Sequence, residues 1–373
     1  MKTKKIMFLT GTRADFGKIK SLIQASSEIR EVEYNIFITG MHLLKKYGNT
    51  HKEVQDVFCN TYEFINQYVD ESMDMVLSNT IAGLSRYIHE NKPDMIVIHG
   101  DRVEALAGAI VGSINNILVA HVEGGERSGT IDELIRHAVT KMSHIHLVSN
   151  EEAKQRIIQM GENSDSVFII GSPDMDVMNS NNLPSIKEVR ERYEIKFDAF
   201  HIVLFHPVTT EINQLEQYAK NLVDALIESK HNYVVIYPNN DMGSSIILKE
   251  YERLKFLSNF KIFPSIRFEY FLTLMKFSKS VIGNSSAGIR EAPFYGIPSI
   301  NIGTRQNMRS IERSIVDIGY EKEEIKRAIQ NVETLKVKKS NKFGVGNSAD
   351  EFKKILQDNR IWNISKQKIF IDI

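Results

Sequence analysis

Short apolar runs rich in β-branched residues alternate along this chain with longer stretches of helical periodicity. In the first half the apolar runs lie at 6–10, 35–39, 95–99, 117–122, 144–148 and 167–170. A second series follows at 202–205, 233–237, 261–263, 281–283 and 299–302. Helical patterns separate most of these runs, for example at 214–229 and 251–257. This alternation is typical of right-handed βαβ units, so it predicts two α/β halves, each with a parallel sheet.

The length of the chain also favours two domains. Its 373 residues exceed the roughly 250–300 at which a single hydrophobic core usually stops growing. The segment 171–185 interrupts the periodic pattern with Gly, Pro, Ser and Asn, which predicts a linker with a boundary near Ser180. We therefore expect a first domain at 1–180, a second at 181–355 and a C-terminal segment at 356–373.

Composition argues against several kinds of partner. The formal net charge is zero, which is not typical of a surface that binds nucleic acid or an anionic membrane, so a small ligand is expected. Cys59 is the only cysteine, which rules out an intramolecular disulfide and fits a reducing cytoplasm. The first apolar run is too short for a signal peptide or a membrane span, so we expect a cytoplasmic protein.

Carboxylates follow two consecutive predicted strands of the first half, and a third lies a few residues further on. Asp101 comes after the run at 95–99, Glu123 directly follows the run at 117–122, and Asp132 lies nine residues further on. In open parallel sheets, ligands bind beyond the carboxyl ends of the strands. Carboxylates that share such a site can differ in pKa and divide the roles of acid and base between them. The pattern therefore favours proton-transfer chemistry.

The loop at 10–18 has the composition of an anion site. It places Arg13 and Lys18 at the expected start of a helix, whose N–H groups and dipole favour a negative charge. The loop matches neither the dinucleotide motif nor the full phosphate-loop motif. Phosphate binding and an ordinary surface loop are therefore both open at this point.

The segment 283–293 follows a predicted strand of the second half and leads into a predicted helix. The hydroxyls of Ser285 and Ser286 can donate to a diphosphate or cap the helix, and Glu291 can accept hydrogen bonds from two sugar hydroxyls. A capped helix without a ligand is the plain alternative. If the segment binds a ligand, a nucleotide-sugar suits its residues.

Other candidate residues lie at the ends of further predicted elements. His206 can hold a phosphate or transfer a proton, although most histidines are structural. Asn239 can contact a ribose or a base, or simply form a turn. Arg267 and Phe268 can flank a base, or simply begin an amphipathic helix.

Several histidines are candidate metal ligands. His137, His144 and His146 lie near Asp132 in the sequence, and His42 follows a glycine turn. Their spacing matches no standard ligand motif, so no metal is expected. A serine hydrolase is poorly supported too, because the sequence contains no G-x-S-x-G segment.

Taken together and in order, several segments resemble the UDP-N-acetylglucosamine 2-epimerases, in particular the hydrolysing branch that serves bacterial sialic acid synthesis. These segments are GTRADFGK, HGDR, HVEGGERSGTIDELIRH, FHPVTTE and GNSSAGIREAPFYGIPSINIGTRQ. The resemblance covers nearly the whole chain. It implies the GT-B architecture of two Rossmann-like domains with parallel sheets flanking an interdomain cleft, and a C-terminal segment that packs back on the first domain.

The resemblance also implies roles for residues. Asp101, Glu123 and Asp132 match the catalytic carboxylates, and Lys18 and His206 are assigned to catalysis with them. The remaining assigned positions would bind the substrate or its nucleotide: Arg13, Arg102, Asn239, Arg267, Phe268, Ser285, Ser286, Glu291 and Arg305. In this branch the diphosphate leaves by anti elimination to an enzyme-bound 2-acetamidoglucal, which water then hydrates to N-acetylmannosamine.

The resemblance leaves some alternatives. Close relatives act on UDP-2,4-diacetamido-2,4,6-trideoxyglucose or GDP-N-acetylglucosamine in legionaminic acid synthesis. More remote alternatives are a GT-B glycosyltransferase and a non-catalytic nucleotide-sugar binding protein, and the three carboxylates weigh against both. The short segment between Glu123 and Asp132 favours hydrolysis. Elimination needs neither a nicotinamide nor a metal, so no cofactor is expected, and relatives imply a homodimer or a dimer of dimers.

Overall fold

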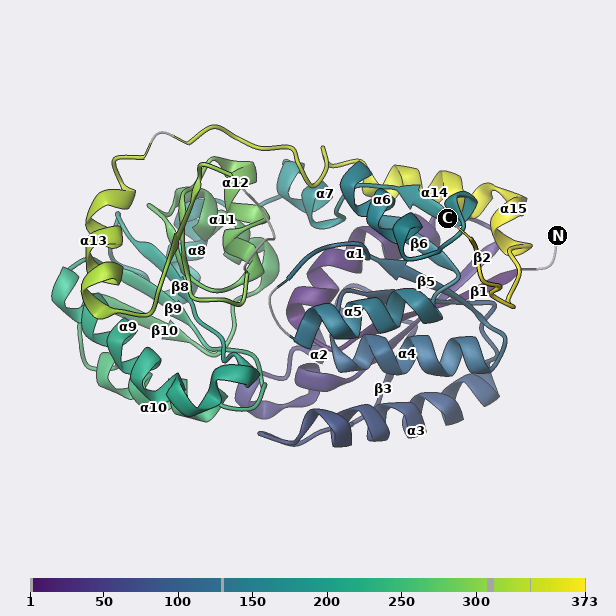
Figure 1. The fold of residues 1–373 in the computed structure, drawn as a ribbon, viewed down its shortest axis with the longest axis horizontal. Coiled ribbons are helices and arrows are strands. Elements are labelled where there is room, and N and C mark those ends of the chain that lie inside the picture. The colour runs from purple at the N-terminus through teal and green to yellow at the C-terminus, as the bar shows by residue number, and fades with distance from the viewer. Residues whose placement is uncertain (1–2, 129–130, 307–311, 336, 373) are drawn as a thin grey trace. The chain divides into compact units, whose positions relative to one another are not determined.

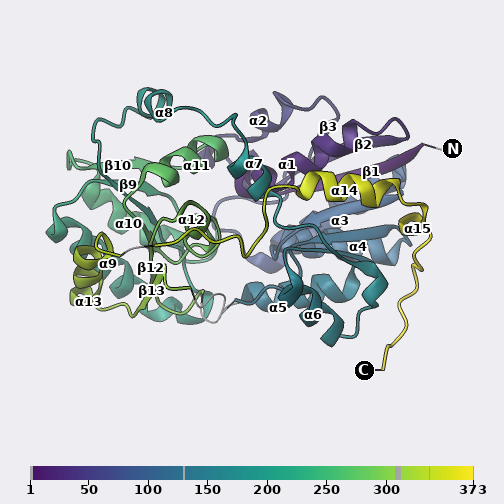
Figure 2. The ribbon, with the colours of Figure 1, turned by 90° about the horizontal axis from the view of Figure 1, so that it is seen from above.

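The structure is a computed structural model that describes residues 3–128, 131–306, 312–335 and 337–372. Contacts divide the chain into two compact units. The first unit takes in the residues up to Glu126, residues 132–181 and the residues from Lys342 onward. The second takes in residues 127–131 and 182–341. Each unit has its own sheet and its own helices, which can be followed in Figure 1 and Figure 2.

In the described part of the first unit, seven parallel strands form one sheet in the order β3-β2-β1-β4-β5-β6-β7. Its strands are β1 (Lys4–Thr10), β2 (Val32–Ile38), β3 (Thr61–Glu63), β4 (Met95–His99), β5 (Leu118–Val122), β6 (Ile145–Val148) and β7 (Val167–Ile169). The strand order reverses between β1 and β4, which are hydrogen-bonded neighbours. Such a reversal opens a crevice at the carboxyl ends of the strands, and the loops after β1 and β4 start there.

Helices cover both faces of this sheet. They are α1 (Arg13–Ser27), α2 (His51–Gln55), α3 (Met73–Asn91), α4 (Val103–Ile114), α5 (Ile131–Met142), α6 (Glu151–Gln159), α7 (Asp174–Asn179), α14 (Ser348–Gln357) and α15 (Asn359–Trp362). Alternate strand residues such as Ile6 and Phe8 are buried against α1 and α14. On the other face α4 approaches so closely that a Cβ added at Gly108 would meet Ile98 at 2.6 Å. Both faces are therefore apolar, as parallel sheets require.

The C-terminal part of the chain belongs to the first unit. Phe352 of α14 lies with its ring centroid 6.4 Å from that of Phe8 in β1, and α14 packs along α1 (Figure 2). The sequence placed residues 342–355 in the second domain, whereas they cluster with the first unit. The physical reason is the apolar face of α14, which is buried in the core of the first unit.

In the described part of the second unit, six parallel strands form a sheet in the order β10-β9-β8-β11-β12-β13. The strands are β8 (His201–Leu204), β9 (Tyr233–Ile236), β10 (Phe260–Phe263), β11 (Val281–Gly283), β12 (Ser299–Ile302) and β13 (Ile315–Ile318). The helices are α8 (Ile186–Tyr193), α9 (Leu215–Ser229), α10 (Ser244–Tyr251), α11 (Phe268–Phe277), α12 (Glu291–Tyr295) and α13 (Lys322–Val332). Here the order reverses between β8 and β11. The two units thus repeat one plan.

The α/β class with two parallel sheets is confirmed, and three details of the prediction are wrong. The edge strands β3 and β13 were missed, because each is short and carries none of the fully buried residues that mark a central strand. The expected helix at 251–257 does not form: α10 ends at Tyr251 and a 3-10 turn follows at Glu252–Leu254. Among the described residues, no helix is both long and apolar enough to cross a membrane.

Candidate functional site

Glu123 lies at the carboxyl edge of the first sheet, directly after β5, in a buried and charged environment. The residue is 4 % exposed, and its backbone has φ of 65°, a left-handed conformation that is unusual for a residue other than glycine. Oε2 of Glu123 lies 3.0 Å from Nε2 of His99 and 3.6 Å from Nζ of Lys18. Oε1 accepts a hydrogen bond from Ser172. The carboxylate is thus held by two cationic groups and a hydroxyl.

Lys18 and His99 each contact a second carboxylate. Nζ of Lys18 lies 3.2 Å from Oδ2 of Asp174, and Nδ1 of His99 lies 3.4 Å from Oδ1 of Asp15. Asp15 lies in the first turn of α1, where the N–H groups and the dipole favour its charge. Burial alone would raise the pKa of the Asp15 carboxyl. The His99 imidazolium lowers that pKa by more than burial raises it, so the net shift is downward. The result is a buried network of alternating charges around Glu123.

This network makes stability depend on pH. Burial lowers the pKa of His99, but the charges of Glu123 and Asp15 outweigh burial and raise it from 6.5 to about 9. Because the folded pKa is the higher one, the stabilisation is complete below about pH 6.5 and is lost as the pH rises through about 9. We expect the urea midpoint of the wild type to be lower at about pH 9 than at about pH 6.5. This decrease should be larger than the decrease in His99→Gln. An equal fall in both proteins would contradict the charge assignment.

Asp101 pairs with Arg136 of α5, the helix that also carries Asp132. Arg136 is 1 % exposed, pairs with Asp101 and donates to the carbonyl of Glu126 at 3.0 Å. Asp132 lies one turn before Arg136 on α5, and residues four apart share a face of a helix. The structure therefore places Asp101 and Asp132 on the same side of α5, at the edge where β4 and β5 end.

His121 fixes the loop that carries Asp101. Burial lowers the pKa of His121 to about 3, so its imidazole is neutral at physiological pH. Nε2 of His121 donates to the carbonyl of Gly100 at 2.8 Å. This bond restrains Gly100, the residue directly before Asp101.

Two cations that the sequence assigned to ligand binding already pair with carboxylates in the first unit. Arg13 pairs with Glu53. Nε of Arg102 lies 3.3 Å from Oε2 of Glu104, which is 2 % exposed. An anion that binds here would share these guanidinium groups with the carboxylates.

In the second unit, His206 is joined to the loops after β9 and β11. The amide of Asn284 accepts from the backbone N–H of His206 at 2.7 Å and donates to its carbonyl at 2.8 Å. Nδ1 of His206 accepts from the backbone N–H of Asn239 at 3.1 Å. An accepting Nδ1 leaves Nε2 as the protonated nitrogen of the neutral ring. The imidazole therefore has a fixed tautomer at the carboxyl edge of the second sheet.

The segment after β11 is not one capped helix. It forms a 3-10 turn (Ser286–Gly288) and then the short α12, in whose first turn Glu291 is buried. Ser285 caps the 3-10 turn, since its hydroxyl accepts from the N–H of Ala287 at 3.3 Å. Arg305 donates to the carbonyl of Asn284 at 3.3 Å. Ser285, Ser286 and Arg305 thus lie close to Asn284, the residue whose amide binds the backbone of His206.

Arg267 and Phe268 occupy the start of α11. Arg267 is the N-cap residue, its backbone N–H donates to the hydroxyl of Tyr193 at 3.1 Å, and its Nε lies 3.4 Å from Oε2 of Glu269. Phe268 is buried, with 8 % of its surface exposed. Both residues therefore have structural contacts at a helix start.

Sequence reasoning missed several residues of these networks. His99 and Asn284 lie inside segments singled out in the sequence, where His99 ends a predicted strand and Asn284 is assigned no role. Ser172 and Asp174 lie in the segment predicted as a linker, and no local pattern distinguishes them. Two of the histidines that the sequence offers as metal ligands have other partners: His42 lies 2.7 Å from the hydroxyl of Thr50, and His146 lies 3.1 Å from Glu162.

Comparison with known proteins gives consistent results. A family described as UDP-N-acetylglucosamine 2-epimerase matches residues 24–357. The chain is 50% identical over 376 residues to the UDP-N-acetylglucosamine 2-epimerase of Neisseria meningitidis serogroup B, with 99% of each chain covered. It is 30% identical to the UDP-N,N'-diacetylbacillosamine 2-epimerase (hydrolyzing) of Legionella pneumophila, covering 95% of this chain and 96% of that one.

A solved structure shows the same fold. The crystal structure of the Methanocaldococcus jannaschii UDP-GlcNAc 2-epimerase, in complex with UDP-GlcNAc and UDP, superposes with a TM-score of 0.82 at 21% identity. The match covers 95% of this chain and 99% of that chain. Two parallel sheets with flanking helices, in a GT-B-like arrangement of the chain, are thus common to both.

Proposed function

The chain belongs to the UDP-N-acetylglucosamine 2-epimerase family, and we propose that it is a hydrolysing member that converts UDP-N-acetylglucosamine and water to UDP and N-acetylmannosamine. The observation that carries this proposal is the buried Glu123 carboxylate, held between His99 and Lys18 at the sheet edge where Asp101 and Asp132 also lie. Burial of an acid is costly unless the acid is paired. A protein that only binds its ligand has no need of a buried carboxylate of this kind, whereas catalysis does.

The chemistry requires an acid and a base. The proton at C2 of the sugar is not next to a carbonyl, so it becomes acidic only as the C1–O bond breaks and C1 gains positive charge. A carboxylate takes this proton while UDP leaves with the electron pair of the C1–O bond. The C2–H electrons form the C1–C2 double bond of 2-acetamidoglucal. Water then adds its oxygen to C1, and a proton returns to the opposite face of C2.

We assign the two halves of this work to the two units. The carboxylates of Asp101, Glu123 and Asp132 carry the proton transfers and guide the water. The role of base is assigned to these three carboxylates as a group. In the second unit, the diphosphate is bound by the imidazole N–H of His206, the hydroxyl of Ser285 and the guanidinium of Arg305, which are all suitable donors.

Two observations support hydrolysis over simple epimerisation. The segment from Glu123 to Asp132 is compact, with no insertion between the carboxylates. The Legionella relative that matches nearly the whole chain is named as a hydrolyzing enzyme. The match at 50% identity to a UDP-N-acetylglucosamine 2-epimerase favours that substrate over a diacetamido sugar.

The test is NMR of the protein with UDP-N-acetylglucosamine in deuterated water that contains a chelator. We expect UDP and free N-acetylmannosamine that carries deuterium at C2, because the proton is exchanged with solvent during elimination and hydration. Full activity is expected to survive the chelator.

Other outcomes would change the assignment. An epimerised sugar still joined to UDP would show a non-hydrolysing enzyme. Unchanged UDP-N-acetylglucosamine together with turnover of the UDP-linked 2,4-diacetamido sugar or of GDP-N-acetylglucosamine would replace the proposed substrate. Complete loss of activity that added metal restores would contradict a metal-free mechanism.

A further inference from the structure

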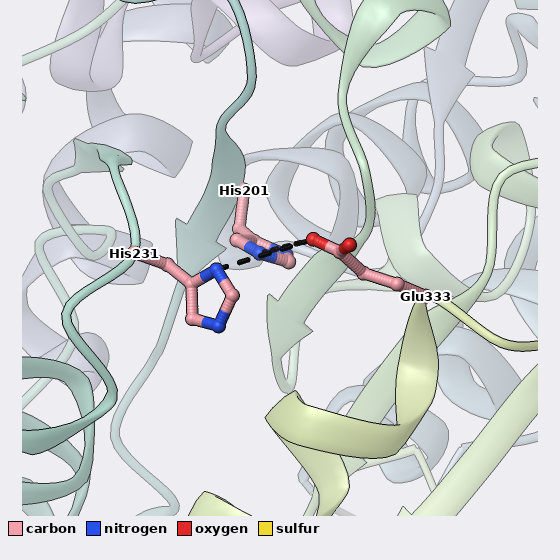
Figure 3. Close-up of side chains that lie close together, drawn as sticks. All are labelled: His201, His231 and Glu333. Carbon is pink, nitrogen blue, oxygen red and sulfur yellow. Dashed lines mark ion pairs between the residues drawn. The ribbon is translucent and has the colours of Figure 1, made fainter.

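Three side chains of the second unit converge at the amino-terminal edge of its sheet (Figure 3). His201 is the first residue of β8, His231 lies between α9 and β9, and Glu333 directly follows α13. One ligand atom from each, two imidazole nitrogens and one carboxylate oxygen, lies within 4.8 Å of the others. Nothing in the proposed reaction uses them, because His206 and its partners lie at the opposite edge of the same sheet.

His201 carries a buried nitrogen that lacks a hydrogen bond. The residue is 1 % exposed, and among the described residues its Nε2 makes no hydrogen bond. Its Nδ1 lies 2.8 Å from the hydroxyl of Ser280, which is fully buried. A hydrogen bond at one ring nitrogen is how metal-binding histidines are usually oriented, so that the lone pair of the other nitrogen faces the ion. Nε2 points toward Glu333, whose Oε1 is 3.4 Å away.

The spacing of the three atoms suits a small metal ion. Ligands at about 2.1 Å from a tetrahedral ion lie about 3.4 Å from each other. The distance from His201 to Glu333 equals this value, and Nδ1 of His231 lies 4.0 Å from the same oxygen. The side chains of His231 and Glu333 are 36% and 38% exposed, so they can shift to shorten the 4.0 Å between Nδ1 of His231 and Oε1 of Glu333.

We propose that His201, His231 and Glu333 form a binding site for one divalent transition-metal ion of the zinc class. Two imidazoles and one carboxylate are the ligand types that such ions prefer, and the fourth position is left to water. The ion would join β8, the α9–β9 loop and the end of α13, and would stabilise the folded second unit.

The site would act on stability and not on turnover. His201 precedes His206 by five residues of mostly extended chain, which corresponds to about 16 Å. Metal binding and the proposed reaction are therefore separate, and a failure of either one leaves the other standing.

The experiment is a titration of the chelator-treated, full-length protein with Zn²⁺, and with Co²⁺ as a spectroscopic probe. We expect one tight equivalent and a higher thermal midpoint with Zn²⁺. His231→Asn and Glu333→Gln change half-exposed residues, so both variants should fold. Each removes a direct ligand, so each should weaken binding by more than the ~10–100-fold that loss of an outer-shell partner costs. Turnover should stay as in the wild type in all of these proteins.

Two further variants serve as controls. His137→Asn removes a half-exposed histidine of α5 that pairs with Glu133, and it should bind like the wild type. Lys279 is exposed, and its charge acts on His201, so Lys279→Gln should tighten binding several-fold, which a damaged fold cannot do. The proposal is overturned if the wild type takes up no Zn²⁺, or if His231→Asn and Glu333→Gln bind as the wild type does.

Discussion

Glu123→Gln is expected to lower kcat by about 10²–10⁴-fold while the affinity for UDP changes little. Glutamine keeps the shape of the side chain and its hydrogen bond to Ser172, but it can neither take nor return a proton. UDP affinity should be retained, because the diphosphate is assigned to donors of the second unit. Turnover of the nucleotide-sugar and calorimetric titration with UDP measure the two quantities on the same preparation.

A matched control separates loss of chemistry from loss of charge pairing. Glu162 is also a buried glutamate between a histidine and a lysine, with His146 at 3.1 Å and Lys141 at 2.7 Å, but it lies before β7, at the other edge of the sheet. Glu162→Gln should lower the thermal midpoint as Glu123→Gln does and keep kcat within a few-fold. If Glu123→Gln retained turnover within tenfold, or if both variants lost it equally, the catalytic assignment would be wrong.

Gly283→Ala is expected to destabilise the second unit by about 3 kcal/mol or more and to abolish UDP binding. Gly283 ends β11 with φ of 133°, and an added Cβ would lie 1.9 Å from the carbonyl oxygen of Leu204 in β8. The obstacle is backbone and cannot rotate away, so β8 and β11 must separate at the point where the loops to His206 and Ser285 begin. Urea unfolding and UDP titration measure both effects.

Gly161→Ala is the control for backbone strain alone. Gly161 also has a positive φ, of 79°, but the nearest atom to an added Cβ is 3.8 Å away. The loss of unfolding free energy in Gly161→Ala should stay near the ~1–2 kcal/mol that an alanine in the left-handed conformation costs. Equal costs in the two variants would show that the contact with Leu204 does not matter.

Much of the fold follows from hydrophobic periodicity, because central strands of parallel sheets are buried on both faces. Residues 95–99, for example, were predicted with the bounds that β4 has. Edge strands carry a weaker signal: β13 has no buried residue, and its sequence alone does not separate it from a loop. The assignment of residues 342–355 failed for a similar reason, since an amphipathic helix does not reveal which core will bury its apolar face.

The candidate site was predicted in part. Glu123 could be found because carboxylates at strand ends are uncommon and chemically meaningful. Its partner Ser172 could not, because a serine in a Pro- and Asn-rich segment has many ordinary uses, and only the fold brings it to Glu123. Asn284 illustrates the same limit: its amide clamps the backbone of His206 across 78 positions of sequence.

The return of α14 to the first unit affects how the chain folds during synthesis. The partner of Phe8 in β1 is Phe352, which the ribosome adds only after the whole second unit has been made. At ~5–20 residues per second, the roughly 190 residues after position 181 take about 10–40 s. During that time the apolar face of α1 lacks its contact with α14, while the second unit can already form its own core. Nascent first units are therefore the stage at which chaperones would be needed.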